Sequence, residues 1–139
     1  MNIETQPKIT KVLLVDDHAP TREEMRILID RQQNMAVCGQ SETGEAAVED
    51  ARRIEPDLII MDIALPGITG VEAMKIIMRE HPQTKILALS NHSGRILVQA
   101  IINAGGMGYV RKDRAFEELI PALHTLLQGE TYLGRHVND

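Results

Sequence analysis

The chain has 139 residues, a formal net charge of −5 at pH 7 and a sequence pI of about 5.5. This length fits one domain, and the acidic balance argues against a broad basic surface for nucleic acid or for an anionic membrane. Hydrophobic residues make up 43% and aromatic residues 2%, which predicts a mainly aliphatic core. Cys38 is the only cysteine and no apolar run is long enough to span a membrane, so a cytoplasmic protein is expected.

The first part of the chain alternates between apolar runs and amphipathic segments. Residues 1–10 are mostly polar and are predicted to form a flexible leader. The run Val12–Val15 has no polar residue, which is typical of a strand buried on both faces. An apolar stripe at helical spacing follows within residues 25–29. A second, weaker strand is predicted at Met35–Cys38 and a second helical stripe at Ala46–Ala51.

The same alternation continues through the rest of the chain. Three further apolar runs each precede a helical stripe, and Gly129 is predicted to end the last helix. In chain order, these strands and helices occupy residues 58–61, 71–78, 86–89, 96–101, 109–110 and 116–127. Residues 129–139 are interpreted as the start of a linker.

This order, strand then helix five times, predicts an α/β fold. Right-handed crossovers would build a (βα)5 doubly wound, five-stranded parallel sheet, for which the common flavodoxin-like strand order is 2-1-3-4-5. In such a sheet, ligands bind beyond the carboxyl ends of the strands. The chemically interesting polar residues within two positions of the ends of the apolar runs are Asp16, Asp17, Asp62, Ser90 and Lys112.

Strand order 2-1-3-4-5 would gather these side chains in one crevice. Two carboxylates about 4 Å apart repel each other by roughly 4 kcal/mol at an effective dielectric constant near 20. Three of them would stay ionised together only if a divalent cation offset this repulsion. Carboxylate and carbonyl oxygens suit Mg²⁺. A carboxylate beside such a cation can act as a nucleophile and form an acyl phosphate, whose oxygens Lys112 and Ser90 would contact.

Each of these residues also has a simpler interpretation. A single aspartate after a strand is more often a helix cap or a turn residue than a nucleophile. Ser90 alone is typical of a turn, and Lys112 alone of a solvated surface. The agreement of four strand ends, each with the required chemical group, favours the site over the separate interpretations.

Four segments of the chain resemble the signature blocks of response-regulator receiver domains. They are Val12–His18, Met61–Gly70, Ala88–Ser90 and Gly108–Asp113. The resemblance runs from about Lys11 to Gln128, which defines a receiver domain at residues 11–128. It implies a signalling phosphoacceptor of a two-component system that promotes only its own phosphorylation and dephosphorylation, and is not an enzyme in the ordinary sense.

The resemblance assigns a role to each acidic residue. Asp62 would be the phosphoacceptor, and Asp17 would bind Mg²⁺ directly. Asp16 would ligate the cation or hold its water molecules, and the backbone carbonyl of Ala64 would complete the ligands that the protein supplies.

The remaining motif residues would bind and report the phosphoryl group. Ser90 and Lys112 would contact it, and Tyr109 would be the switch aromatic that turns inward as Ser90 moves. The alternative for Tyr109 is a half-buried aromatic at the edge of the sheet. Asn91 and Ala64 depart from common family choices, and the lifetime of the phosphoryl group is predicted to depend on both.

Details of the resemblance imply partners. Asp113 after Lys112, and the segment Leu127–Leu133, are similar to regulators with a LuxR-type helix-turn-helix output domain. The implied partners are a sensor histidine kinase, a second copy of the phosphorylated chain, and DNA only through a missing C-terminal domain; no membrane is implied. Residues 96–128 or the first and last helices would form the dimer face.

Other hypotheses remain open at this stage. The chain is alternatively a stand-alone or phosphorylation-independent receiver that acts as a protein-interaction module. An FMN-binding protein of the same fold would need a phosphate-cradling loop, whereas Asp16–Pro20 would repel phosphate without a metal. An aspartyl phosphatase usually has a second acid two residues after the nucleophile, where this chain has Ala64.

Overall fold

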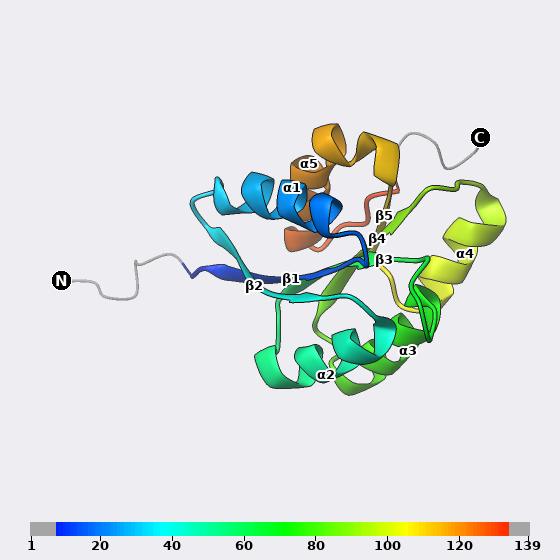
Figure 1. Ribbon diagram of the computed structural model, residues 1–139. Coiled ribbons are helices and arrows are strands. Elements are labelled where there is room, and N and C mark those ends of the chain that lie inside the picture. The colour runs from blue at the N-terminus through cyan, green and yellow to red at the C-terminus, as the bar shows by residue number, and fades with distance from the viewer. Residues whose placement is uncertain (1–7, 134–139) are drawn as a thin grey trace.

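The computed structural model describes residues 8–133, which form one five-stranded parallel sheet with helices on both faces (Figure 1). The strand order is β2-β1-β3-β4-β5, which confirms the predicted fold. The elements are β1 (Thr10–Val15), α1 (Ala19–Asp30), β2 (Met35–Ser41), α2 (Gly44–Ile54), β3 (Leu58–Asp62), α3 (Gly70–Glu80), β4 (Lys85–Ser90), α4 (Arg95–Asn103), β5 (Gly108–Arg111) and α5 (Ala115–Leu127).

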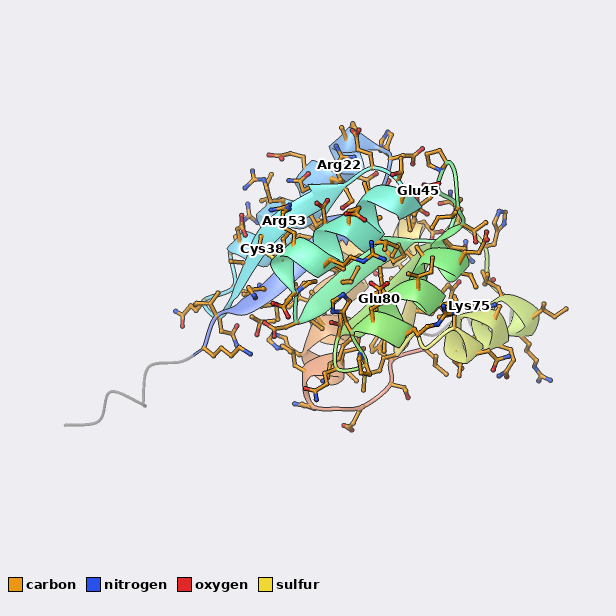
Figure 2. All side chains as sticks on the ribbon, turned by 90° about the horizontal axis from the view of Figure 1, so that it is seen from below. Arg22, Cys38, Glu45, Arg53, Lys75 and Glu80 are labelled. Atoms are coloured by element: carbon orange, nitrogen blue, oxygen red, sulfur yellow. The ribbon has the colours of Figure 1, made fainter. Side chains whose placement is uncertain are left out.

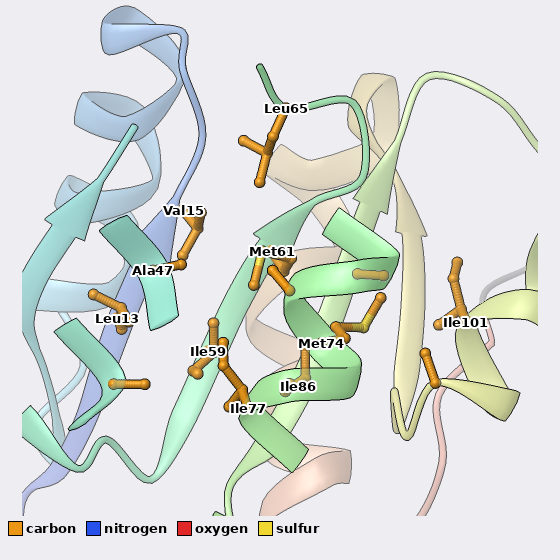
Figure 3. Close-up of a cluster of buried hydrophobic side chains, with 14 of the residues drawn as sticks. Leu13, Val15, Ala47, Ile59, Met61, Leu65, Met74, Ile77, Ile86 and Ile101 are labelled. Carbon is orange, nitrogen blue, oxygen red and sulfur yellow. The ribbon is translucent and has the colours of Figure 1, made fainter. Parts of the chain in front are cut away.

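The central strands are apolar throughout because both of their faces are covered. Helices α1 and α5 lie on one face, and α2, α3 and α4 lie on the other (Figure 1). Along β1, Val12 and Leu14 pack on the α1–α5 side, while Leu13 and Val15 pack on the opposite side (Figure 3). Hydrophobic burial on both sides therefore removes the alternation of polar and apolar residues that a half-exposed strand would show.

Strand β2 is longer than the apolar run that predicted it, and it ends at Ser41. It lies at the edge of the sheet, where most of its side chains are only partly buried. Polar residues such as Gln40 are compatible with such a strand, so hydrophobicity alone could not place its end. Strand β1 begins at Thr10, which lies within the predicted leader. Residues 1–7 of that leader lie outside the described residues.

Helices α1, α2 and α3 each begin with a side-chain cap next to the carboxyl edge of the sheet, and the caps of α1 and α3 follow the strands that lead to the aspartates. The ring of His18 accepts a hydrogen bond from the backbone N–H of Thr21 and thereby caps α1 directly after the acidic pair. Thr69 and Glu72 form a capping box at the start of α3, which ends the loop after Asp62. The caps at His18 and Thr69 therefore define where the loops after β1 and β3 end and the helices begin.

The segment that leaves α5 returns to the sheet. Gly129 ends the helix with a φ of 84°, a left-handed conformation that glycine adopts without strain. Tyr132 then pairs with β5: its carbonyl accepts from the N–H of Tyr109 at 2.7 Å, and its hydroxyl donates to Glu118 at 2.8 Å. The segment at Thr131–Leu133 therefore covers the outer edge of β5, and residues 134–139 of the predicted linker lie outside the described residues.

The first residue of α3 lies against the strand that carries Asp62. A Cβ atom added to Gly70 would lie 2.8 Å from Cα of Ile63 and would meet the carbonyl oxygen of Asp62. Both of these neighbours are backbone atoms, so they cannot move away as a side-chain tip would. The absence of a side chain at Gly70 therefore allows the close approach of α3 to β3.

We expect Gly70→Ala to lower the free energy of unfolding by about 1–3 kcal/mol, because overpacking must displace backbone. Urea unfolding of the variant and of the unchanged chain measures the difference. Gly129→Ala is the control, since open space surrounds that position and only the left-handed backbone opposes the substitution. A loss in Gly70→Ala no larger than in the control would contradict the packing argument.

Candidate functional site

The carboxyl ends of four adjacent strands bring the predicted site residues together. Asp16 and Asp17 follow β1, and Asp62 and Ser90 are the last residues of β3 and β4. Lys112 follows β5, in a short 3-10 turn before α5. The register aligns these ends, since Asp62 is opposite Leu89 of β4 and Ser90 is opposite Arg111 of β5.

The ammonium group of Lys112 lies between two buried carboxylates. Its Nζ is 2.9 Å from Oδ2 of Asp16 and 3.0 Å from Oδ2 of Asp62. The Asp16 side chain is 0% exposed and that of Asp62 is 3% exposed. Since buried carboxylates must be paired, one cation here stabilises two anions that the fold holds close together.

Burial and pairing oppose each other in setting the pKa values at this site. Burial raises the pKa of the Asp62 carboxyl above its ordinary value, although hydrogen bonds from Lys112 and from the N–H of Ala64 act in the opposite direction. Burial also opposes the charged form of Lys112, but its ion pairs with Asp16 and Asp62 outweigh this and raise the pKa of the ammonium. The lysine is therefore charged at neutral pH, and Asp62 is less acidic than an exposed aspartate.

The three aspartates fit a divalent cation. Asp16, Asp17 and Asp62 each offer a carboxylate oxygen, and these oxygens lie within 4.8 Å of one another. Oδ2 of Asp16 is buried and, within residues 8–133, accepts no well-aligned hydrogen bond, although the Lys112 ammonium is close by. Oδ1 of Asp62 accepts from the N–H of Ala64 at 3.0 Å, so the peptide at Ala64 also borders the cluster. Such a set of oxygens suits a hard ion such as Mg²⁺.

Ser90 and Tyr109 are connected through the backbone of His92. The N–H of His92 donates to the Ser90 hydroxyl oxygen at 3.0 Å, and the Tyr109 hydroxyl donates to the His92 carbonyl at 2.5 Å. Tyr109 is 1% exposed, so it is not the half-buried edge aromatic of the alternative interpretation. One residue of the loop between β4 and α4, His92, is thus held both by the Ser90 hydroxyl and by the buried tyrosine.

Two side chains that border the site were not predicted from the sequence. Arg22 of α1 donates to the backbone carbonyl of Asp16, and Glu45 of α2 accepts from the N–H of Ile68 at 3.2 Å in the loop after β3. Both helical positions looked like ordinary surface charges in the sequence. Only the packing of α1 and α2 against the sheet places them beside the loops that carry the aspartates.

The raised pKa of Asp62 predicts how stability depends on pH. The native state binds the proton of the Asp62 carboxyl more tightly than the unfolded chain does. The protonated carboxyl therefore favours folding, and this contribution to stability is lost as pH rises through the folded pKa. We expect Asp62→Asn to raise Tm at pH 7 in EDTA. The gain should shrink toward pH 4, where the carboxyl of the unchanged chain approaches protonation.

Thermal unfolding between pH 4 and pH 7 measures this dependence. Asp113→Asn is a suitable control, since that carboxylate is exposed and pairs only with Arg111 among the described residues. An equal effect of Asp62→Asn at both ends of the pH range would show that burial of the charge is not its cause.

Comparison with known proteins identifies relatives for most of the chain. The family model described as "Response regulator receiver domain" matches residues 12–124. The response regulator GacA of Pseudomonas syringae pv. syringae is 31% identical over 127 residues, which are 91% of this chain and 59% of GacA. The transcriptional regulatory protein YdfI of Bacillus subtilis is 35% identical over 125 residues, which are 90% of this chain and 58% of YdfI. The chain therefore spans less than two thirds of these relatives.

Solved structures agree with the family model. A two-component response regulator of the LuxR family from Aurantimonas sp. SI85-9A1 superposes with a TM-score of 0.89 at 32% identity, covering 94% of this chain and 93% of that one. Separately, none of the helices in residues 8–133 combines the length and the apolar character needed to cross a membrane.

Proposed function

Since this chain belongs to the response regulator receiver domain family, we propose that Asp62 accepts a phosphoryl group from a sensor histidine kinase. The observation that carries this proposal is the position of Lys112 between the Asp16 and Asp62 carboxylates. An oxygen of Asp62 would form a bond to phosphorus while the bond from phosphorus to the donor nitrogen breaks, and the donor imidazole leaves. The product is an acyl phosphate on Asp62.

Asp17, Asp16 and Asp62, with the backbone carbonyl of Ala64, would hold Mg²⁺ beside the nucleophile. A bound Mg²⁺ would neutralise charge on the phosphoryl oxygens. Asp62 is almost fully buried, so its carboxylate would be largely stripped of water when it attacks phosphorus. The chain would act as a signalling phosphoacceptor that promotes its own phosphorylation.

Lys112 and Ser90 would bind the new phosphoryl oxygens. The Lys112 ammonium would exchange part of its contact with Asp62 for these oxygens. The Ser90 oxygen already accepts a hydrogen bond from His92, so its O–H proton is the group that would donate to the phosphoryl group. Both contacts need the phosphoryl group, so phosphorylation would shift the conformational population toward the active arrangement that makes them.

The switch would reach the output side through Tyr109. Its hydroxyl holds the loop that begins at Ser90, and its backbone N–H holds Tyr132 in the segment that leaves α5. A movement of Ser90 would thus alter both the loop that leads into α4 and the segment Thr131–Leu133 that follows α5. We propose that this change favours a homodimer of a cytoplasmic transcription regulator, with DNA bound by a C-terminal output domain outside this acidic chain.

Incubation with Mg²⁺ and acetyl phosphate, followed by intact mass measurement, tests the phosphoacceptor. We expect one added phosphoryl group in the unchanged chain, none in Asp62→Ala, and none in excess EDTA. If the unchanged chain gains no phosphoryl group even with its cognate kinase, the proposal fails and the chain acts as a phosphorylation-independent interaction module.

The lifetime of the acyl phosphate should depend on two exposed neighbours of the site, Asn91 and Ala64. The Ala64 methyl group cannot orient an attacking water molecule, whereas an amide there can. We expect Ala64→Asn to shorten the lifetime, and Asn91→Ala to change it by altering access to the phosphoryl group. Loss of the added mass with time, after removal of the donor, gives the decay rates; unchanged rates in both variants would refute this dependence.

A further inference from the structure

Arg22 is a nearly buried arginine whose donors are directed at the base of the acidic loop. It lies on α1, at the side of the sheet where β2 forms the edge (Figure 2). Its side chain is 11% exposed. Nη1 donates to the backbone carbonyl of Asp16 at 2.5 Å, Nε donates to Gln40 at 3.0 Å, and Nη2 lies 3.2 Å from Glu42.

The bond to Asp16 completes a set of contacts that fixes the backbone there. On the other side, the N–H of Asp16 donates to the carbonyl of Ser41 at 3.0 Å. Oδ1 of Asp16 accepts from the N–H of His18 at 2.8 Å, which closes the turn. Both polar groups of the Asp16 backbone are therefore held, one by β2 and one by Arg22.

The carbonyl that Arg22 holds belongs to the peptide unit leading into Asp17. A planar peptide moves as one unit, so holding its oxygen also sets the position of the Asp17 Cα atom. The Asp17 side chain is exposed, and within residues 8–133 its carboxylate has no hydrogen bond or ion pair of its own. Its place beside Asp16 and Asp62 is therefore decided by its backbone.

We propose that Arg22 is a positioning residue for the cation site, through the peptide that joins Asp16 and Asp17. This inference rests on the proposed Mg²⁺ site. The geometry requires arginine in particular, because a planar guanidinium reaches three acceptors in fixed directions, whereas a lysine ammonium at the end of a flexible chain does not.

The positive charge of Arg22 would weaken Mg²⁺ binding, whereas its positioning role would strengthen it. A guanidinium near the cluster repels a divalent cation, and its ion pair with the mostly exposed Glu42 only partly offsets this. If charge dominated, removal of Arg22 would tighten Mg²⁺ binding. If positioning dominates, as proposed here, removal weakens it, so the sign of the change separates the two effects.

Calorimetric titration of the full chain with Mg²⁺ alone tests the proposal on Arg22→Gln, Arg22→Lys and Arg26→Gln. Arg26 is the matched control, because it lies one turn further along α1 and pairs only with Glu23 and Asp30 among the described residues. We expect Arg22→Gln to raise the Kd for Mg²⁺ about tenfold, as losing a residue that orients metal ligands typically does. Arg22→Lys should also raise it, and Arg26→Gln should match the unchanged chain.

Thermal unfolding separates positioning from a general structural role. Both roles lower Tm in EDTA, but only positioning reduces the further rise in Tm that a given Mg²⁺ concentration produces. An unchanged or lower Kd for Mg²⁺ in Arg22→Gln overturns the proposal. If that variant does not fold, an unchanged or lower Kd in Arg22→Lys overturns it instead. Absence of Mg²⁺ binding in the unchanged chain instead overturns the proposed cation site, and this inference with it.

Discussion

The ion pairs of Lys112 with Asp16 and Asp62 are the interaction on which the site depends. Two carboxylates inside a protein repel each other strongly, and without a cation one of them would have to take up a proton. The ammonium of Lys112 lies about equally far from both, at 2.9 and 3.0 Å. The unmodified protein thus contains a stabilised cluster of charge, and a phosphoryl group would enter it by competing for this lysine.

The sheet makes that cluster possible. In the order β2-β1-β3-β4-β5, strands β1 and β4 lie on either side of β3, so the residues after β1 and β4 flank Asp62. The apolar faces of the strands are covered by α1 and α5 on one side and by α2, α3 and α4 on the other. Hydrophobic packing holds the strands in register, and the polar residues occupy only the strand ends, where their burial is offset by pairing.

Hydrogen bonds to the backbone link this cluster to more distant parts of the molecule. His92 connects the Ser90 hydroxyl to the Tyr109 hydroxyl, and the N–H of Tyr109 holds the segment at Tyr132 that leaves the domain. On the opposite side, Arg22 connects the acidic loop to β2. The same cluster is thus held by α1 and β2 at one side and bears on the β4–α4 loop and the exit segment at the other.

The fold class follows from the sequence alone, because a strand buried on two faces is a continuous apolar run and a helix buried on one face carries an apolar stripe. The chemical groups of the site also follow from the sequence, since Asp16, Asp17, Asp62, Ser90 and Lys112 all lie within two residues of the end of a predicted strand. The partners of these groups become known only from the folded structure. A hydrogen bond from α1 to a loop carbonyl, a bridge through the His92 backbone and the return of residues 131–133 to β5 all join residues through the packing of separate elements, which leaves no periodic signal in the sequence.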